Sequence, residues 1–469
     1  MKRGRVRLIT VWMLVWFVGF GSRAGAVEVN VCLGPDGQFL PWVVADEQGA
    51  VAVVWEDYRT RKDWDVYAQL LSPDGRKLWE GDGMPLCVER GNQRYLRMAR
   101  SRNRFVVAWN DKRTGNWEIY AQAFDGTGAV LWQENGVPVC VHPAEQSTIA
   151  CLSDGSGGAV IAWEDGRRDS AARDLYIQRM DATGQPMWEQ NGIPVLPSDS
   201  LQSDPQLIGD FGEGFYVVWW NVIGYEQWRI MAYRIGFDGK PFWKEPVVVS
   251  GEGAPPHSKS PSPPVLYGEP RVTEDGEGGI VVVWQTYENF INDNLYAQRI
   301  DRDGKKQWGE RGVTICDALG IQKHASIAAD GHEGIVVVWR DERDVYSDLY
   351  AQRLDRDGKP QWRTNGVPIC VAGGHQDKPS LVRWGSERFF VAWVDFREDY
   401  GEESRNAIYG QAIDLEGNVL WEQAGVPICT AKGEQQPPFA IGTALDGLAV
   451  VWSDARRDLG DIYMWLYQR

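Results

Sequence analysis

Six copies of an aspartate and an arginine, two residues apart, are the side chains of this sequence that most suggest chemistry. Each pair follows a tryptophan: Asp57/Arg59, Asp111/Arg113, Asp165/Arg167, Asp341/Arg343, Asp395/Arg397 and Asp454/Arg456. A further acid, Asp65, Asp174, Asp348 or Asp461, precedes the tyrosine that follows in four copies. Arranged around an axis, the pairs could hold a charged ligand. Alternatively, each carboxylate binds its guanidinium across one turn. Because one active site needs no sixfold repetition, we expect the pairs to be structural.

Two more copies of the same tryptophan, Trp219 and Trp284, lack the pair and carry aromatic and amide side chains instead. A Pro-rich insertion, 251–270, separates them. Aromatic rings beside amides suit a sugar ring or a peptide, although drift of two copies toward apolar turns would leave the same pattern. The ligand site predicted from these departures consists of Trp220, Tyr225, Trp228, Tyr267, Tyr287, Asn289 and Phe290.

Other reactive side chains follow no pattern typical of a metal or cofactor site. The histidines, His142, His257, His324, His332 and His375, have no metal-ligand spacing, and we expect them at surface or loop positions. Two Asp-x-Asp-Gly turns, at 301–304 and 355–358, suggest calcium but lack the further acidic ligands of a calcium loop. No nucleophile elbow, P-loop or dinucleotide fingerprint occurs. The sequence therefore predicts no metal and no cofactor.

The elements that position these residues are set by an internal repeat of about 54 residues. Its first tryptophan falls at Trp55, Trp109, Trp163, Trp219, Trp284, Trp339, Trp393 and Trp452. Each copy contains four short strands. The first follows a Gln-x-x-Pro-like start, as at Gln376–Pro379; in the copy at 334–370 the second ends at Trp339, the third spans 348–354 and the fourth spans 362–370. The second strand is apolar at every position, which indicates burial of both faces. Stacked four-stranded antiparallel blades bury strands in this way, so the repeat predicts an all-β propeller.

The two ends of the chain indicate that this propeller closes. The last copy stops within its third strand at Arg469, and Glu28-Val-Asn-Val-Cys32 matches the fourth-strand ending Val367-Pro-Ile-Cys370. One blade would then be completed by both termini, which leaves no open sheet edge. We predict an eight-bladed propeller with its N-terminal strand in the last blade.

The cysteines are expected to be unpaired although the protein is expected to be exported. Six of them occupy the same place, the end of the fourth strand: Cys32, Cys87, Cys140, Cys316, Cys370 and Cys429. Equivalent points on different blades lie beyond the reach of a disulfide, about 7 Å between Cα atoms. Cys151, on a first strand, has no evident partner.

The hairpin between the third and fourth strands carries two resemblances. Met180-Asp-Ala-Thr-Gly184 with Trp188 resembles the tryptophan-docking hairpin of quinoprotein-type propellers, with one residue fewer between Asp and Gly, and is similar also to the Asp-box hairpin of sialidase-type propellers. The whole repeat, with Trp-x-Asp-x-Arg and Asp-Ile-Tyr-Ala-Gln, resembles exported bacterial β-propeller repeat proteins of uncharacterised function. These resemblances imply a stabilising element and carry over no active site.

The first 26 residues indicate export. A basic start, MKRGRVR, precedes an apolar run from Leu8 to Gly21 and the small residues Ala24-Gly-Ala26, as in a cleaved signal peptide; an uncleaved anchor is the alternative. Residues 27–469 would form one propeller domain, secreted, periplasmic or at the cell surface, without a membrane span. Loss of residues 1–26 removes five basic residues and no acid, which lowers the net charge from −16 to −21. Such acidity disfavours nucleic acid as a partner.

These observations favour a monomeric, non-catalytic binding or scaffold protein for carbohydrate or protein ligands. The alternative is an extracellular polysaccharide hydrolase or lyase, with its site at the mouth of the propeller channel. Unrepeated acids or arginines gathered at one central place would favour the enzyme.

Overall fold

The computed structural model describes residues 25–168, 172–223, 227–250, 266–267, 270–289, 292–397, 406–444 and 446–468. Within these ranges the chain is all β, and no helix occurs, as the repeat predicts. None of the described residues forms a helix that is long and apolar enough to cross a membrane. The expected signal peptide, except for its last two residues, lies outside the described residues.

Six of the sheets contain four antiparallel strands each. Three of them come first along the chain: β2 (Gln38–Ala45), β3 (Val51–Asp57), β4 (Asp65–Leu71) and β5 (Met84–Cys87); β6 (Gln93–Ser101), β7 (Arg104–Asp111), β8 (Glu118–Asp125) and β9 (Val137–Cys140); β10 (Gln146–Ser153), β11 (Ala159–Asp165), β12 (Asp174–Met180) and β13 (Ile193–Pro194). The others are β14 (Leu201–Gly209), β15 (Gly214–Ile223), β16 (Gln227–Gly236) and β17 (Val247–Val248); β27 (Gln376–Trp384), β28 (Arg388–Asp395), β29 (Ala407–Asp414) and β30 (Val426–Cys429); and β31 (Phe439–Thr443), β32 (Gly447–Asp454) and β33 (Asp461–Tyr467) with β1 (Ala26–Cys32).

The remaining strands form a nine-stranded sheet. They are β18 (Leu266–Tyr267), β19 (Arg271–Glu274), β20 (Ile280–Asn289), β21 (Asn292–Ile300), β22 (Val313–Cys316), β23 (Gly320–Ala329), β24 (Ile335–Asp341), β25 (Asp348–Leu354) and β26 (Val367–Cys370). A short parallel pairing of Asn292 with Gly320 and of Asp293 with Ile321 joins two repeats here. The two repeats that contain β19–β22 and β23–β26 therefore form one continuous sheet instead of the two separate four-stranded sheets that the repeat predicts.

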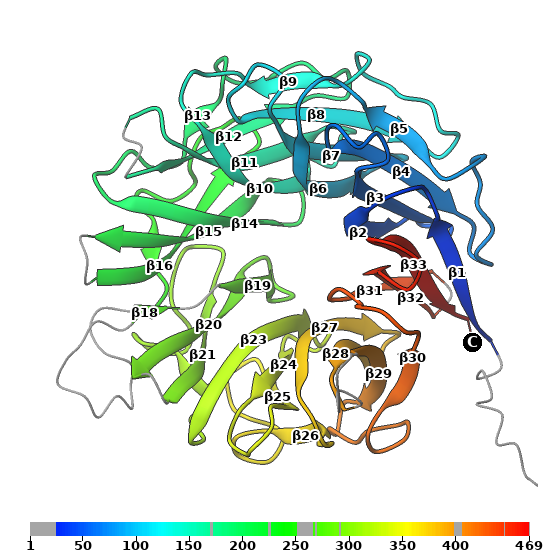
Figure 1. Ribbon diagram of the computed structural model, residues 1–469. Coiled ribbons are helices and arrows are strands. Elements are labelled where there is room, and N and C mark those ends of the chain that lie inside the picture. Colours follow the sequence, from blue (N-terminus) through cyan, green and yellow to red (C-terminus); the bar gives the residue numbers. More distant parts are fainter. Residues whose placement is uncertain are drawn as a thin grey trace, which may run out of the picture.

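The sheets are arranged around a centre, as in a β-propeller (Figure 1). The innermost strands contact one another in chain order, β2, β6, β10, β14, β19, β23, β27 and β31, and β31 in turn contacts β2. Second strands such as β3 are buried at every position, and the first tryptophan of each repeat has an exposed fraction of at most 2%. The apolar runs thus form the core between adjacent sheets.

The N-terminal strand completes the sheet that contains the C-terminal strand. β1 pairs antiparallel with β33, with Ala26 opposite Tyr467 and Cys32 opposite Ile462. An ion pair between Glu28 and Arg456, 2.7 Å apart, holds the two ends of the chain together. The sequence match between residues 28–32 and the fourth strands therefore reflects a real position in the sheet.

The second tryptophan of a repeat reaches into the hairpin of the next. The Trp132 indole N–H donates to the Ala182 carbonyl at 3.1 Å, and Trp243, Trp308 and Trp362 make the same contact with later hairpins. Gly184 has φ +82°, and a Cβ there would lie 2.8 Å from the Trp132 ring. Glycine is thus required where the indole meets the turn.

All seven cysteines are free, and all except Cys151 are fully buried. This confirms the expectation of unpaired thiols. Burial raises the pKa of each thiol to about 12, so they are small apolar residues and not nucleophiles.

Candidate functional site

The Asp–Arg pairs lie at the face of the ring where the innermost strands begin, which we call the leading face. In the first pair, the Arg59 Nε and Nη2 atoms donate to the Asp57 carboxylate at 2.8 and 2.6 Å. Asp57 also accepts from the Trp55 indole at 2.8 Å, and the guanidinium lies 3.8 Å from the centroid of the Tyr67 ring. The carboxylate is fully buried. These groups are engaged with one another and not directed at a ligand.

The contacts of Nη2, the indole and the tyrosine ring recur in all six pairs, the contact of Nε recurs in all except Asp454/Arg456, and each arginine also contacts the cysteine that precedes it in the repeat. The Arg113 Nη2 atom, for example, lies 3.3 Å from the Cys87 sulfur, and in the six copies this distance is 3.0–3.5 Å. Each pair therefore links its tryptophan, its tyrosine and the neighbouring sheet.

A second buried acid lies opposite each of several pairs. Asp65 is paired with Asp57 in the β3–β4 register and has an exposed fraction of 2%. Burial, with the charges of Asp57 and Asp63, raises the pKa of Asp65 to about 7. Burial likewise raises the pKa values of Asp348 and Asp461 to about 6. These carboxyls make the stability of the protein depend on pH.

The aromatic site predicted around β15–β21 is brought together only in part. The rings of Trp220 and Trp228 meet edge to face at 5.6 Å, and Tyr267 on β18 lies beside Tyr287 on β20, since Tyr267 pairs with Thr286 and Leu266 with Tyr287. Tyr225 and Phe290 lie outside the described residues, as do the side chains of Tyr267, Tyr287 and Asn289. This surface stays a prediction.

A different set of unrepeated side chains is presented by a bulge in the innermost strands. In six of these strands the register shifts three residues after the start of the repeat, and one non-glycine residue adopts a left-handed conformation with φ between 46° and 59°. These residues are Leu40, Tyr95, Thr148, Asp204, His324 and Lys378. Such bulges re-aim a side chain, and the strained backbone is typical of functional positions. The repeat thus places one variable side chain per sheet near the axis.

His324 and Lys378 are two of these residues, and they meet. The His324 Nδ1 atom lies 2.6 Å from the Asp377 Oδ1 atom, and the His324 Nε2 atom lies 3.2 Å from the Lys378 ammonium nitrogen. Because a carboxylate only accepts, the proton is on Nδ1, and Nε2 carries the lone pair. His324 was expected at a surface or loop position; it lies in strand β23 and not in a loop, and its side chain is half-buried.

Asp377 is held as an anion by its neighbours. It accepts from Arg340 at 2.9 Å and from the backbone N–H of Lys378 at 2.7 Å. Burial alone would raise the pKa of Asp377, but the hydrogen bond from His324, the charge of Arg340 and the hydrogen bond from the Lys378 backbone N–H outweigh it and lower the pKa. The arrangement orients the imidazole and leaves Nε2 directed toward the exposed Lys378 side chain.

Other acids of the leading face are occupied as acceptors. Glu56 accepts from the Arg94 Nε atom at 2.7 Å and from the Tyr95 N–H at 2.6 Å. Glu164 accepts from the Ser203 hydroxyl at 2.6 Å and from the Asp204 N–H at 3.1 Å. Both acids therefore tie one sheet to the bulge of the next.

Arg97, on the innermost strand β6, interacts electrostatically with charged residues of three other strands. Burial lowers the pKa of Arg97, and the charges of Asp204, Arg271 and Glu56 all act on it. Its guanidinium also lies 4.8 Å from the centroid of the Trp42 ring. Charged residues of β3, β14 and β19 thus act electrostatically on Arg97 of β6.

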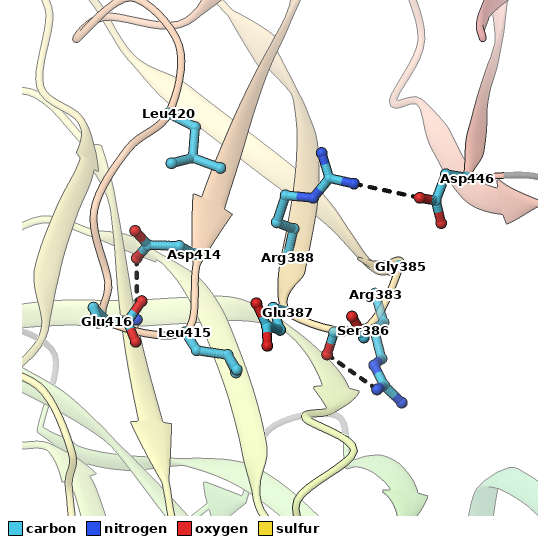
Figure 2. Close-up of a pocket in the computed structure, with 10 residues that line it drawn as sticks. All are labelled: Arg383, Gly385, Ser386, Glu387, Arg388, Asp414, Leu415, Glu416, Leu420 and Asp446. Carbon is cyan, nitrogen blue, oxygen red and sulfur yellow. Dashed lines mark hydrogen bonds and ion pairs between the residues drawn. The ribbon is translucent and has the colours of Figure 1, made fainter. Parts of the chain in front are cut away.

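A pocket of about 990 Å³ opens at the other end of the strands. Figure 2 shows its lining, with Arg388 directed toward Asp446 at 3.6 Å and Arg383 toward the Ser386 carbonyl at 3.2 Å. In the sheet before it, Asp330 and Arg353 form an ion pair of 2.8 Å at this place. Trp384 and Ala412 occupy the equivalent positions in this sheet, which therefore lacks the ion pair.

Among the described residues, no group of three or more His, Cys, Asp or Glu side chains could hold a metal ion.

No family model matches the chain, and no curated protein matches it. Among solved structures, a puromycin-hydrolysing peptidase of Mycobacterium tuberculosis is similar at 12% identity and a TM-score of 0.45, over 90% of this chain and 58% of the peptidase. The chain thus spans less than two thirds of that protein. An ulvan lyase is similar at 10% identity and a TM-score of 0.42, over 68% of this chain and 79% of the lyase. The endosialidase of phage phi92 is similar at 9% identity and a TM-score of 0.41, over 95% of this chain and 69% of the endosialidase.

These likenesses assign no residue and no substrate to this chain, because the identities and TM-scores are low. All three proteins are nevertheless enzymes, and a fourth similar structure is that of an arabinofuranosidase. The expectation of a non-catalytic binding or scaffold protein is therefore wrong.

The residues missed by sequence reasoning are Tyr95, His324, Asp377 and Lys378. The sequence does contain a signal for them. The first strand of these copies begins with a glutamine, Gln93, Gln322 or Gln376, and the missed residues follow it by one or two positions, where the residue type differs from copy to copy.

Proposed function

We propose that this protein is an exported polysaccharide-cleaving enzyme whose site lies on the leading face of an eight-bladed propeller. Residues 1–26 would direct export, and residues 27–469 would form the single propeller domain. The contact of β31 with β2 and the pairing of β1 with β33 support closure of the ring. The observation that carries the proposal is the His324–Asp377–Lys378 cluster, because it combines an oriented base with an exposed cation near the axis.

The reaction that this cluster fits best is β-elimination from a uronate-containing polysaccharide. Abstraction of the proton beside a carboxylate requires a base and a cation that stabilises the developing negative charge. His324 Nε2 would take the proton at C5, and the Lys378 ammonium would bind the carboxylate. The C4–C5 double bond forms as the C4–O bond breaks, and His324 returns the proton to the departing oxygen. Asp377 would hold the imidazole in the tautomer that this step needs.

Hydrolysis fits the same residues less well. A glycosidase uses two carboxyl groups, one as acid and one as base or nucleophile. Glu56, Glu164 and Asp377 already accept at least two hydrogen bonds each from the protein. Their hydrogen bonds come from groups that hold the sheets together, whereas the partner of the His324 Nε2 lone pair is the ammonium of the exposed Lys378 side chain, which a substrate carboxylate could draw away.

The test is incubation of the protein with a panel of acidic and neutral polysaccharides, followed by ultraviolet absorbance and mass analysis of the products. Unsaturated products are expected from a uronate-containing substrate, and His324→Ala should lower the rate about a hundredfold or more. His332→Ala, an exposed histidine at the opposite end of the strands, is the matched control and should retain the rate. Saturated products alone would overturn elimination, and the absence of any cleavage would overturn the enzyme.

A further inference from the structure

A row of aromatic side chains crosses the leading face from the β2–β5 sheet to the β6–β9 sheet. We call Phe39, Tyr58, Trp64, Tyr95 and Trp117 the aromatic band. Phe39 lies 5.6 Å and Tyr58 lies 4.9 Å from Trp64, and Tyr95 lies 6.2 Å from Trp117, between ring centroids. All five rings are half-buried or exposed, and Tyr95 has an exposed fraction of 49%.

One arginine joins the two halves of the aromatic band. The Arg94 guanidinium lies 4.8 Å from the centroid of Trp64 and 5.3 Å from that of Tyr95. Its Nε atom donates to Glu56, which among the described residues is the one acceptor for this guanidinium. Its terminal nitrogens therefore remain able to donate to a ligand. Lys112, 5.2 Å from the Trp117 ring, adds a second cation.

The loops that carry the aromatic band are fixed by backbone hydrogen bonds. The Trp64 carbonyl accepts from the Gln93 N–H at 2.7 Å, and the Trp117 carbonyl accepts from the Gln146 N–H at 3.0 Å. Tyr95 is set by its left-handed backbone, with φ 59°, and by the bond from its N–H to Glu56. A surface that is already ordered loses little entropy on binding.

The aromatic band is particular to these two sheets. The positions of Trp64 and Trp117 are held by Arg173, Ser347, Asn406 and Gly460 in other copies of the repeat. The position of Tyr95 is held by Leu40, Thr148, Asp204, His324 and Lys378. Repetition therefore does not explain the aromatic band, and core packing does not either, because the rings are not buried.

We infer that the aromatic band is a binding subsite for anionic sugar rings of a polysaccharide. Aromatic faces pack against the apolar faces of sugar rings, and a guanidinium with free N–H groups binds a carboxylate or sulfate. This inference rests on the proposed function, because it assumes that the subsite and the His324 cluster bind the same polysaccharide. Both lie at the leading face, where the innermost strands bulge. It holds the chain, whereas His324 cleaves it.

Binding is tested on the full chain carrying His324→Ala, so that no probe is cleaved. The probes are tetrasaccharides of galacturonate, of sulfated galactose and of neutral galactose, measured by calorimetry. Galacturonate or sulfated galactose should bind more tightly than neutral galactose, and the comparison of the two identifies the anion. Trp117→Ala and Tyr95→Ala should each weaken binding about tenfold, whereas Tyr346→Ala, on a loop of another sheet, should not.

Unchanged affinity in both aromatic band variants, with melting temperatures like that of the parent, would overturn the inference even if the wild-type protein cleaves polysaccharide. Equal affinity for neutral and anionic tetrasaccharides would overturn the role of Arg94. Conversely, loss of binding in these variants, with no cleavage by the wild-type protein, would support the subsite and refute the proposed enzyme.

Discussion

Replacement of Asp65 by asparagine should change how stability depends on pH. Asp65 is buried opposite Asp57, and burial with the charges of Asp57 and Asp63 raises its pKa from 3.8 to about 7. Between these values the folded protein binds a proton that the unfolded chain has lost. The free energy of unfolding of the wild-type protein should therefore fall as the pH rises from about 4 to about 7.

The size of this effect follows from the shift. A shift of about three pKa units corresponds to a free energy of about 4 kcal/mol, at 1.36 kcal/mol per unit. Because solvent and the nearby Arg59 charge screen the carboxylate, we expect an effect on the free energy of unfolding of about 2 kcal/mol. Asparagine resembles the protonated acid and cannot ionise. Asp65→Asn should thus match the wild-type protein near pH 4 and exceed its free energy of unfolding by about 2 kcal/mol near pH 8.

Urea unfolding followed by tryptophan fluorescence across this pH range measures the difference. Asp303→Asn, in an exposed turn, is the control and should follow the wild-type pH dependence. If Asp65→Asn were parallel to the wild-type protein at every pH, the buried acid would not be protonated in the folded state and the reasoning would fail.

Three further changes test the fold. Arg397→Met leaves the buried Asp395 carboxylate without its cation and should lower the free energy of unfolding by about 3 kcal/mol; a loss below 0.5 kcal/mol in urea unfolding would speak against a structural role for the pair. Gly184→Ala places a Cβ against the Trp132 ring at a positive φ and should cost about 2–3 kcal/mol, whereas Gly115→Ala, with open space around it, should cost only about 1 kcal/mol; equal losses would refute the close approach. A thiol-reactive dye should count seven free thiols after denaturation without reductant, and a lower count would reveal a disulfide.

The repeat predicts the strands well because the constraint on them is strong. Val336–Trp339 is apolar at each position, which only a strand buried on both faces explains, and β24 spans Ile335–Asp341. The match of residues 28–32 to the other fourth strands predicts their position in the last sheet, and β1 pairs there. Equivalent positions in a repeat have similar surroundings, so the strands assigned in one copy of the repeat apply to the other copies.

The repeat pattern does not predict the candidate site, because the site depends on a local break in the strand. The sequence pattern predicts a site at the copies that lack the Asp–Arg pair. In the structure, variable residues instead point toward the centre at a bulge that follows a buried glutamine. Period-two alternation predicts no bulge at His324, and its partner Asp377 is 53 residues away. The position after the glutamine marks the residues of the bulge, but it does not show that His324 and Asp377 of neighbouring sheets meet.

Polysaccharide cleavage at the leading face is tested most directly by a crystal structure of the His324→Ala protein with the acidic oligosaccharide that the wild-type protein cleaves. The expected result is a chain bound at the leading face, with a uronate carboxylate near the Lys378 ammonium and C5 near the position of the missing imidazole. A ligand bound instead in the Arg388 pocket at the opposite end of the strands, with the leading face empty, would contradict it.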